Sequence, residues 1–164
     1  MALAYPLFGT TATHFLALRQ QWGEERWQAW CRALQANRPF LVDGNSVVVN
    51  LVGRGEAWIG LTDSDDIAAG RRDGLPIAEL PLTGETLIIR NTVAVVRGAP
   101  HAAAAEKLFD YLQRVEVAEK LVIANALEGV SATSLTVPAL KPDWNSLLRD
   151  LDAATAALKD IFLR

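Results

Sequence analysis

Residues 6–14 of the chain read PLFGTTATH, and this stretch decides how the N-terminal part folds. A short apolar segment, residues 2–5, runs into Pro6, which cannot continue an inner strand. Gly9 and three threonines follow, and apolar residues then recur at helical spacing over residues 15–22. This order predicts a strand, a tight glycine-containing turn and the N-terminus of a helix.

The predicted helix N-terminus has two interpretations. The first turn of a helix carries unpaired N–H groups and a partial positive charge, so it favours an anion. Thr10, Thr11 and Thr13 carry hydroxyls that either cap the helix or contact a ligand. Because caps are far more common than ligand sites, spacing alone favours a threonine cap.

Composition restricts the class of protein. The chain has 164 residues, of which 51% are hydrophobic, and this is enough for one globular domain with a core. A net charge of −3 and the absence of any Lys/Arg cluster argue against a nucleic-acid partner. No apolar run approaches the length of a membrane span and no signal-peptide pattern opens the chain, so neither membrane insertion nor a signal peptide is expected in it. Cys31, the single cysteine, lies among apolar residues at helical spacing and is expected to be buried.

Up to residue 80 the chain alternates short apolar strands with helices. Strands are expected at residues 2–5, 40–42, 57–61 and 76–80, and helices at 24–36, 47–52 and 65–72 in addition to the first. The valine-rich residues 47–52 also suit a strand, but the turn and cap signal at 43–46 favours a helix. The alternation predicts an α/β fold with a mostly parallel central sheet flanked by helices on both faces.

Ligands of such sheets bind beyond the carboxyl ends of the strands. Three predicted strand-to-helix loops lie there, at residues 9–13, 44–46 and 62–66, and all three are rich in small polar side chains. Their predicted convergence favours a ligand contact over a simple cap at residues 9–13.

The pattern changes after residue 84. Residues 86–96 form a long extended segment that we expect to cross between two sheets, because it is too long for an ordinary strand. Amphipathic helices are expected at about 105–112 and 115–124, and an irregular segment at 125–140. A last helix begins at Asp143, with one face formed by Trp144, Leu147, Leu148, Leu151, Leu158 and Ile161.

Five short phrases occur in an order and spacing that resemble a known family. They are YPLFGTT at 5–11, GNS at 44–46, RGEA at 54–57, GLTDSDD at 60–66 and NTVAVVRGAPH at 91–101. Together they resemble the C-terminal half of an extracellular solute-binding protein of the ferric-ion-binding type, with the type II periplasmic binding fold of ABC importers. The resemblance covers nearly the whole chain. It implies a non-catalytic transport role, a small anion or metal complex as ligand, an ABC permease as partner, and a periplasmic or extracellular location for the full-length relative.

The resemblance also implies a set of ligand-binding residues. Gly9 and Thr10 correspond to the helix N-terminus that holds a phosphate or carbonate anion beside the metal, and Asn45 and Ser46 to a further polar contact. The full expected set is Gly9, Thr10, Thr11, Asn45, Ser46, Asp63, Ser64, Asp65 and Asp66.

The chain departs from the family at the loop that contains Asp65 and Asp66. Ferric-binding relatives carry two adjacent tyrosines there, whereas neither Tyr5 nor Tyr111 of this chain is near, so ligation of iron by phenolate is not implied. Asp65 and Asp66 offer hard oxygen ligands for a cation, such as a ferric ion with phosphate or carbonate. They are equally suited to stabilising the N-terminus of their own helix, and both roles stay open.

The resemblance implies a division of the chain into two parts. Residues 1–85 with 129–164 are expected to form the lobe-2 α/β domain, and residues 86–128 the hinge-return segment that completes lobe 1 in relatives. Because the given chain begins at the strand that opens lobe 2, residues 86–128 lose their usual partner. We expect them to fold back on the lobe or, preferably, to exchange with a second copy in a homodimer.

Two alternative functions are weaker. One is an effector-sensing or scaffold domain of the same fold, although nothing resembles a helix-turn-helix. The other is a metal-dependent enzyme that uses Asp63, Asp65 and Asp66, although no cluster of His or Glu accompanies them. His14 and His101 have no partners in a catalytic arrangement, and structural roles fit them better.

Overall fold

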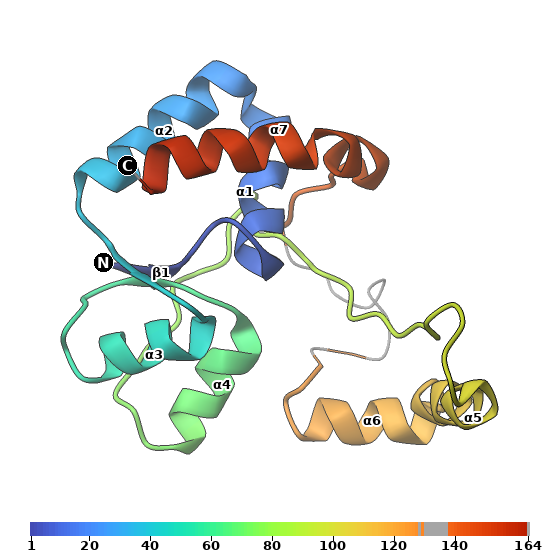
Figure 1. Ribbon diagram of the computed structural model, residues 1–164. Coiled ribbons are helices and arrows are strands. Elements are labelled where there is room, and N and C mark those ends of the chain that lie inside the picture. Colours follow the sequence, from blue (N-terminus) through green and yellow to red (C-terminus); the bar gives the residue numbers. More distant parts are fainter. Residues whose placement is uncertain (128, 130–137, 164) are drawn as a thin grey trace. The chain divides into compact units, whose positions relative to one another are not determined.

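The computed structural model describes residues 1–127, 129 and 138–163 (Figure 1). The chain divides into two compact units. Unit 1 comprises residues 1–87 and the chain from Pro138 onward, and unit 2 comprises residues 88–137. The roles of these units as lobe 2 and hinge-return segment remain predictions.

The sheet of unit 1 has three parallel strands, β1 (Ala2–Ala4), β2 (Phe40–Val42) and β3 (Gly60–Leu61), in the order β2-β1-β3. All three residues of the central strand β1 are buried. Leu3 belongs to one apolar cluster and Ala2 to another, as expected for neighbouring strand residues that face opposite sides of a sheet. The predicted parallel sheet with helices on both faces is therefore confirmed.

Three helices pack together in the larger cluster, α1 (Gly9–Trp22), α2 (Glu24–Ala36) and α7 (Trp144–Phe162) (Figure 1). Phe15 of α1 lies between aromatic partners, with ring centroids 5.0 Å from Trp30 and 6.1 Å from Phe162. The cluster consists of Leu3, Phe15, Leu16, Ala17, Leu18, Trp27, Cys31, Leu34, Leu140, Leu147, Ala154, Leu158 and Phe162. Four consecutive residues of α1 are buried because neighbouring elements cover this helix on more than one side.

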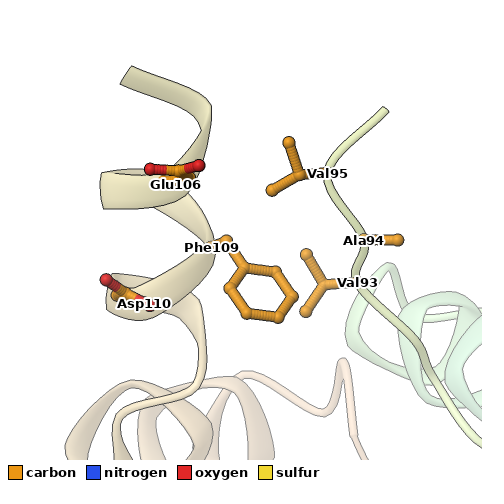
Figure 2. A pocket seen from close by; sticks show the side chains of 6 residues that line it. All are labelled: Val93, Ala94, Val95, Glu106, Phe109 and Asp110. Atoms are coloured by element: carbon orange, nitrogen blue, oxygen red, sulfur yellow. The ribbon is translucent and has the colours of Figure 1, made fainter. Parts of the chain in front are cut away.

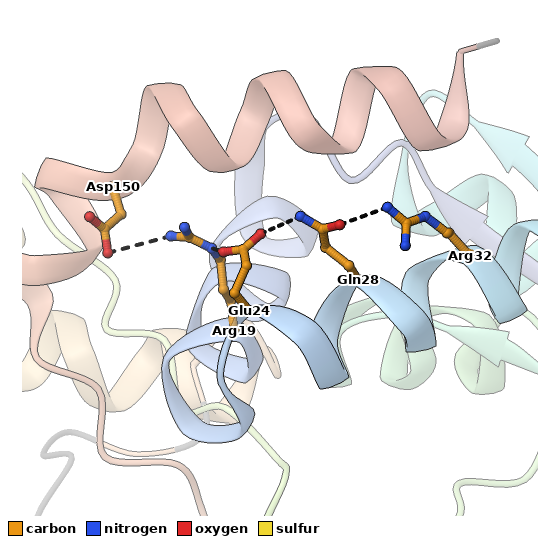
Figure 3. Close-up of polar contacts among 5 residues, drawn as sticks. All are labelled: Arg19, Glu24, Gln28, Arg32 and Asp150. Atoms are coloured by element: carbon orange, nitrogen blue, oxygen red, sulfur yellow. Dashed lines mark hydrogen bonds and ion pairs between the residues drawn. The ribbon is translucent and has the colours of Figure 1, made fainter.

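A short polar network ties the same three helices together at their surface (Figure 3). Arg19 of α1 is paired with Glu24 of α2 and, at 3.4 Å, with Asp150 of α7. Burial alone would raise the pKa of Glu24, but hydrogen bonds from Gln28 and Arg19 outweigh it and lower the pKa. Exposed ion pairs of this kind contribute about 0–1 kcal/mol each, so the apolar cluster dominates the stability of this side.

Helix α3 (Asn45–Gly53) packs on the second face of the sheet, and α4 (Ser64–Arg72) packs against α3. The predicted helix at 47–52 is confirmed. Glycines allow the close approach: a Cβ on Gly70 of α4 would lie 2.5 Å from Val49 Cγ1, and a Cβ on Gly60 would lie 2.5 Å from Val48 Cγ1.

Unit 2 contains α5 (Ala102–Leu112) and α6 (Val115–Ile123), both of which were predicted. Val117 is the only buried residue among those that the structure describes in this unit. A shallow open pocket lies between α5 and the extended residues 93–95; Figure 2 shows Phe109 pointing toward Val93 and Val95. The residues that line it are Val93, Ala94, Val95, Glu106, Phe109 and Asp110. It contains none of the predicted ligand-binding residues.

Several predictions about the elements are wrong. Residues 76–80 form no strand, and residues 86–96 join no sheet. The predicted strand at 57–61 is paired only at Gly60–Leu61. In each case the apolar pattern is present, but none of these residues beyond Gly60–Leu61 lies in a strand ladder of the described chain.

The buried face of α7 also differs from the prediction. Leu147, Ala154, Leu158 and Phe162 are buried, whereas Trp144, Leu148 and Leu151 are 45%, 72% and 40% exposed. The predicted irregular segment 125–140 falls largely on residues 128 and 130–137, outside the described residues. None of the described helices is long and apolar enough to cross a membrane.

Candidate functional site

Three helices of unit 1 begin shortly after the carboxyl ends of the three strands. α1 begins at Gly9 after β1, α3 at Asn45 after β2, and α4 at Ser64 after β3. Because the strands are parallel, these three N-termini share one edge of the sheet. We call this edge the rim, comprising residues 9–11, 44–46 and 62–66.

Side chains from the three rim loops meet in one hydrogen-bonded group. Thr10 Oγ1 donates to Asp63 Oδ2 at 2.7 Å, and Asn45 Nδ2 donates to the same oxygen at 2.6 Å. Asn45 Nδ2 also lies 3.1 Å from Thr10 Oγ1. A fourth contact supports the group, since Thr62 Oγ1 donates to the backbone carbonyl of Asn45 at 3.2 Å. Residues as far apart in sequence as 10 and 63 are thus held in direct contact.

The three rim helices have no side-chain caps. Phe8, Gly44 and Asp63 occupy the N-cap positions of α1, α3 and α4, and none of them makes a side-chain capping bond. A simple threonine cap, the less favoured alternative for residues 9–13, does not form, because Thr10 Oγ1 donates to Asp63 and Thr13 Oγ1 donates to the Gly9 carbonyl at 2.9 Å. The favoured alternative, a ligand contact, stays a prediction. The predicted turn and N-cap at residues 43–46 lie where expected, since Gly44 is the N-cap residue of α3, but no side chain forms a capping bond there and Asn45 Nδ2 donates to Asp63 instead.

Uncapped N-termini keep their partial positive charge. The first N–H groups of a helix have no partners within the helix, and here no capping side chain supplies one. Gly9 makes the tight start of α1 possible, since its φ of +65° lies in the left-handed region that disfavours other residues. The rim therefore presents three helix N-termini that are suited to an anion.

Carboxylates gather at the same rim. One oxygen from each of Asp63, Asp65 and Asp66 lies within 4.8 Å of the others. Partial burial and then the charges of Asp65 and Asp63 raise the pKa of Asp66. Burial is the larger cause of this raised pKa, and repulsion among the three carboxylates adds to it. A bound cation would relieve the repulsion. Three carboxylate oxygens also match the ligand preference of hard cations.

One polar atom at the rim is unsatisfied. Asn45 Oδ1 is buried and accepts no hydrogen bond from any residue that the structure describes. The side-chain orientation is chemically consistent, because turning the amide over would place its oxygen against the carboxylate of Asp63. Buried polar atoms are usually hydrogen-bonded, so this oxygen is an exception at the rim.

The remaining predicted residues surround this group. Ser46 and Ser64 are exposed and Thr11 is half-buried, all at the first turns of the rim helices. The backbone carbonyl of Ser46 accepts a bond from Asn50 Nδ2 at 2.9 Å. Their roles as ligand contacts remain predictions.

Sequence reasoning missed one residue of the rim, Thr62, and set aside Tyr5, which lies at the carboxyl end of β1. Thr62 holds Asn45 in place, and the signal for it was its position directly after β3. Tyr5 was set aside as distant, yet it directly follows β1, and its N–H donates to the Val42 carbonyl at 2.9 Å at the carboxyl edge of the sheet. Tyr111 lies on α5 in unit 2.

The histidines take no part in the hydrogen-bonded group. His14 Nε2 lies 2.7 Å from the backbone carbonyl of Glu85, and His101 occupies the N-cap position of α5 without a side-chain cap.

Comparison with known protein families gives a match for this chain. A family profile described as bacterial extracellular solute-binding protein matches residues 1–122, which is more than half of the chain. The chain belongs to this family of bacterial extracellular solute-binding proteins. Membership indicates a substrate-binding role in transport, in the periplasm or outside the cell, and favours this role over catalysis. No curated protein and no solved structure matches the chain.

Proposed function

We propose that the rim of this solute-binding protein is its ligand contact and that the ligand is an anion paired with a metal cation. The observation that carries the proposal is the contact of Thr10, Asn45 and Asp63, which brings three uncapped helix N-termini and three carboxylates to one edge.

Electrostatics favours the pair over a free anion. An anion alone would approach Asp63, Asp65 and Asp66, and their charges would repel it. A cation alone would satisfy the carboxylates but leave the helix N-termini unused. A cation held by carboxylates, with an anion on its far side that accepts bonds from the helix N–H groups, uses both features.

A ferric ion with phosphate or carbonate is the specific pair that we propose. Ferric ion is a hard cation, and carboxylate oxygens are suitable donors for it without the tyrosine pair of ferric-binding relatives. Asp63 contributes through its second oxygen, because Oδ2 already accepts bonds from Thr10 and Asn45. The loaded protein would deliver this ligand to an ABC permease.

Calorimetry tests the proposal. Phosphate, ferric nitrilotriacetate and their mixture are titrated into the full chain, and the mixture is expected to bind most tightly. Asp65→Asn and Thr10→Val should each weaken binding about tenfold, the effect of about 1.4 kcal/mol. Asp73→Asn, at the other end of α4, is the matched control and should bind as the wild type does.

Two results would contradict the proposal. One is the absence of binding heat with all three titrants. The other is equal affinity in Asp65→Asn and Asp73→Asn, which would place the ligand away from the rim.

A further inference from the structure

The chain leaves unit 1 and returns to it at neighbouring points. We call residues 83–87 the outgoing segment and residues 138–143 the returning segment; both belong to unit 1. The N–H of Leu140 donates to the Thr86 carbonyl at 2.8 Å, so the two segments are hydrogen-bonded to each other. We call this hydrogen-bonded pair of segments the crossing. It connects unit 1 to residues 88–137.

Helix α1 holds both segments of the crossing. His14 Nε2 contacts the Glu85 carbonyl at 2.7 Å and, because a carbonyl only accepts, this nitrogen carries the proton. Gln20 bonds twice to the backbone of Asp143: its Oε1 accepts from the Asp143 N–H at 2.8 Å, and its Nε2 donates to the Asp143 carbonyl at 3.4 Å. Helix α1 is therefore hydrogen-bonded to the outgoing segment at Glu85 and to the returning segment at Asp143.

The same helix begins at the rim. Thr10 lies one turn before His14 at a spacing of four residues, which places both on one side of α1. Between His14 and Gln20, residues 15–18 are buried in the apolar cluster, so this helix is firmly packed. Helix α1 therefore makes contacts at the rim through Thr10 and with both segments through His14 and Gln20.

We propose that His14 and Gln20 are positioning residues through which α1 links the rim to the crossing. The link to ligand binding rests on the proposed function of the rim. Both the neutral Nε2–H tautomer and the imidazolium donate to a carbonyl, so the His14 contact persists when the ring is protonated.

Amide hydrogen exchange at Leu140 in the full chain tests the positioning role without ligand. His14→Phe removes one hydrogen bond and should speed this exchange about fivefold to tenfold. Gln20→Leu removes two hydrogen bonds and should speed it at least as much. His14→Gln supplies a side-chain N–H and should restore slower exchange. Gln21→Leu, an exposed neighbour on α1, is the matched control. Unchanged exchange in His14→Phe and Gln20→Leu, or acceleration no greater than their loss of global stability accounts for, would overturn the positioning role.

Amide exchange at Leu140 in the presence of ferric nitrilotriacetate and phosphate tests the link between the rim and the crossing. The mixture should slow exchange at Leu140 in the wild type and have less effect in His14→Phe, a response that a purely structural role would not give. Binding heat without any change at Leu140 would overturn the link and leave the proposed function standing. Absence of binding heat would instead remove the proposed function and the link, while the positioning role is decided by the ligand-free exchange.

Discussion

At the residue scale, Asp66 should reduce stability at neutral pH. Its pKa is raised from 3.8 by burial and then by the charges of Asp65 and Asp63, so the folded state binds its proton more tightly than the unfolded state does. The stabilisation by that proton is full below the unfolded value and is lost as the pH rises through the raised folded value. We therefore expect Asp66→Asn to raise the melting temperature at pH 7 but not at pH 3. Asp152→Asn, which removes an exposed carboxylate from the middle of α7, is the control. A lower melting temperature for Asp66→Asn at pH 7 would contradict the unfavourable environment of the Asp66 carboxylate.

Cys31 gives a second prediction at this scale. Its side chain is fully buried, and burial followed by the charge of Glu24 raises the pKa of the thiol to about 12. The thiolate is the reactive form, so a thiol reagent at pH 8 should label the unfolded chain and leave the folded chain unlabelled. Stoichiometric labelling in native buffer would show that α2 does not pack as described.

At the scale of elements, the contact between α3 and α4 requires a glycine. Gly70→Ala adds a Cβ 2.5 Å from Val49 Cγ1 and should destabilise the fold by about 1–3 kcal/mol, measured by urea unfolding. In an unhindered helix the same change would stabilise by about 1 kcal/mol. Adding Val49→Ala opens space and should make Gly70→Ala less costly. A Gly70→Ala variant as stable as the wild type would argue against this packing.

The sequence predicted the helices and strands better than it predicted which segments pair or contact one another. Helices α2, α4 and α7 follow from apolar spacing and local end signals, which depend on residues within a few positions. The strand at 76–80 was wrongly predicted because an apolar run shows suitability for a strand but not whether a neighbour pairs with it. The partners of Thr10 and Asn45 could not be predicted from the sequence, because capping uses the same polar atoms as a tertiary contact. Only the fold, by bringing Asp63 beside them, decides between the two.

At the scale of the whole molecule, the exposed apolar side chains of unit 2 lead us to predict self-association. α5 has no buried residue, and four apolar side chains of α5 and α6 are exposed, Leu108, Tyr111, Val115 and Ile123. Exposed apolar surface of this kind favours association, so we predict a dimer formed by segment exchange. Because residues 86 and 87 belong to unit 1, the exchanged part of the predicted segment 86–128 begins at residue 88. Light scattering after size-exclusion chromatography should give a dimer mass that falls toward the monomer in a Leu108→Ser, Ile123→Ser variant. A monomer mass for the wild type at high concentration would contradict this prediction.

The central claim is that the rim of unit 1 holds the solute. The most direct measurement is an anomalous difference map, recorded at the iron absorption edge, from crystals of the full chain grown with ferric nitrilotriacetate and phosphate. We expect an iron peak beside the carboxylates of Asp63, Asp65 and Asp66, with phosphate density at the first turns of α1, α3 and α4. An iron peak at any other part of the chain, with none at the rim, would contradict it.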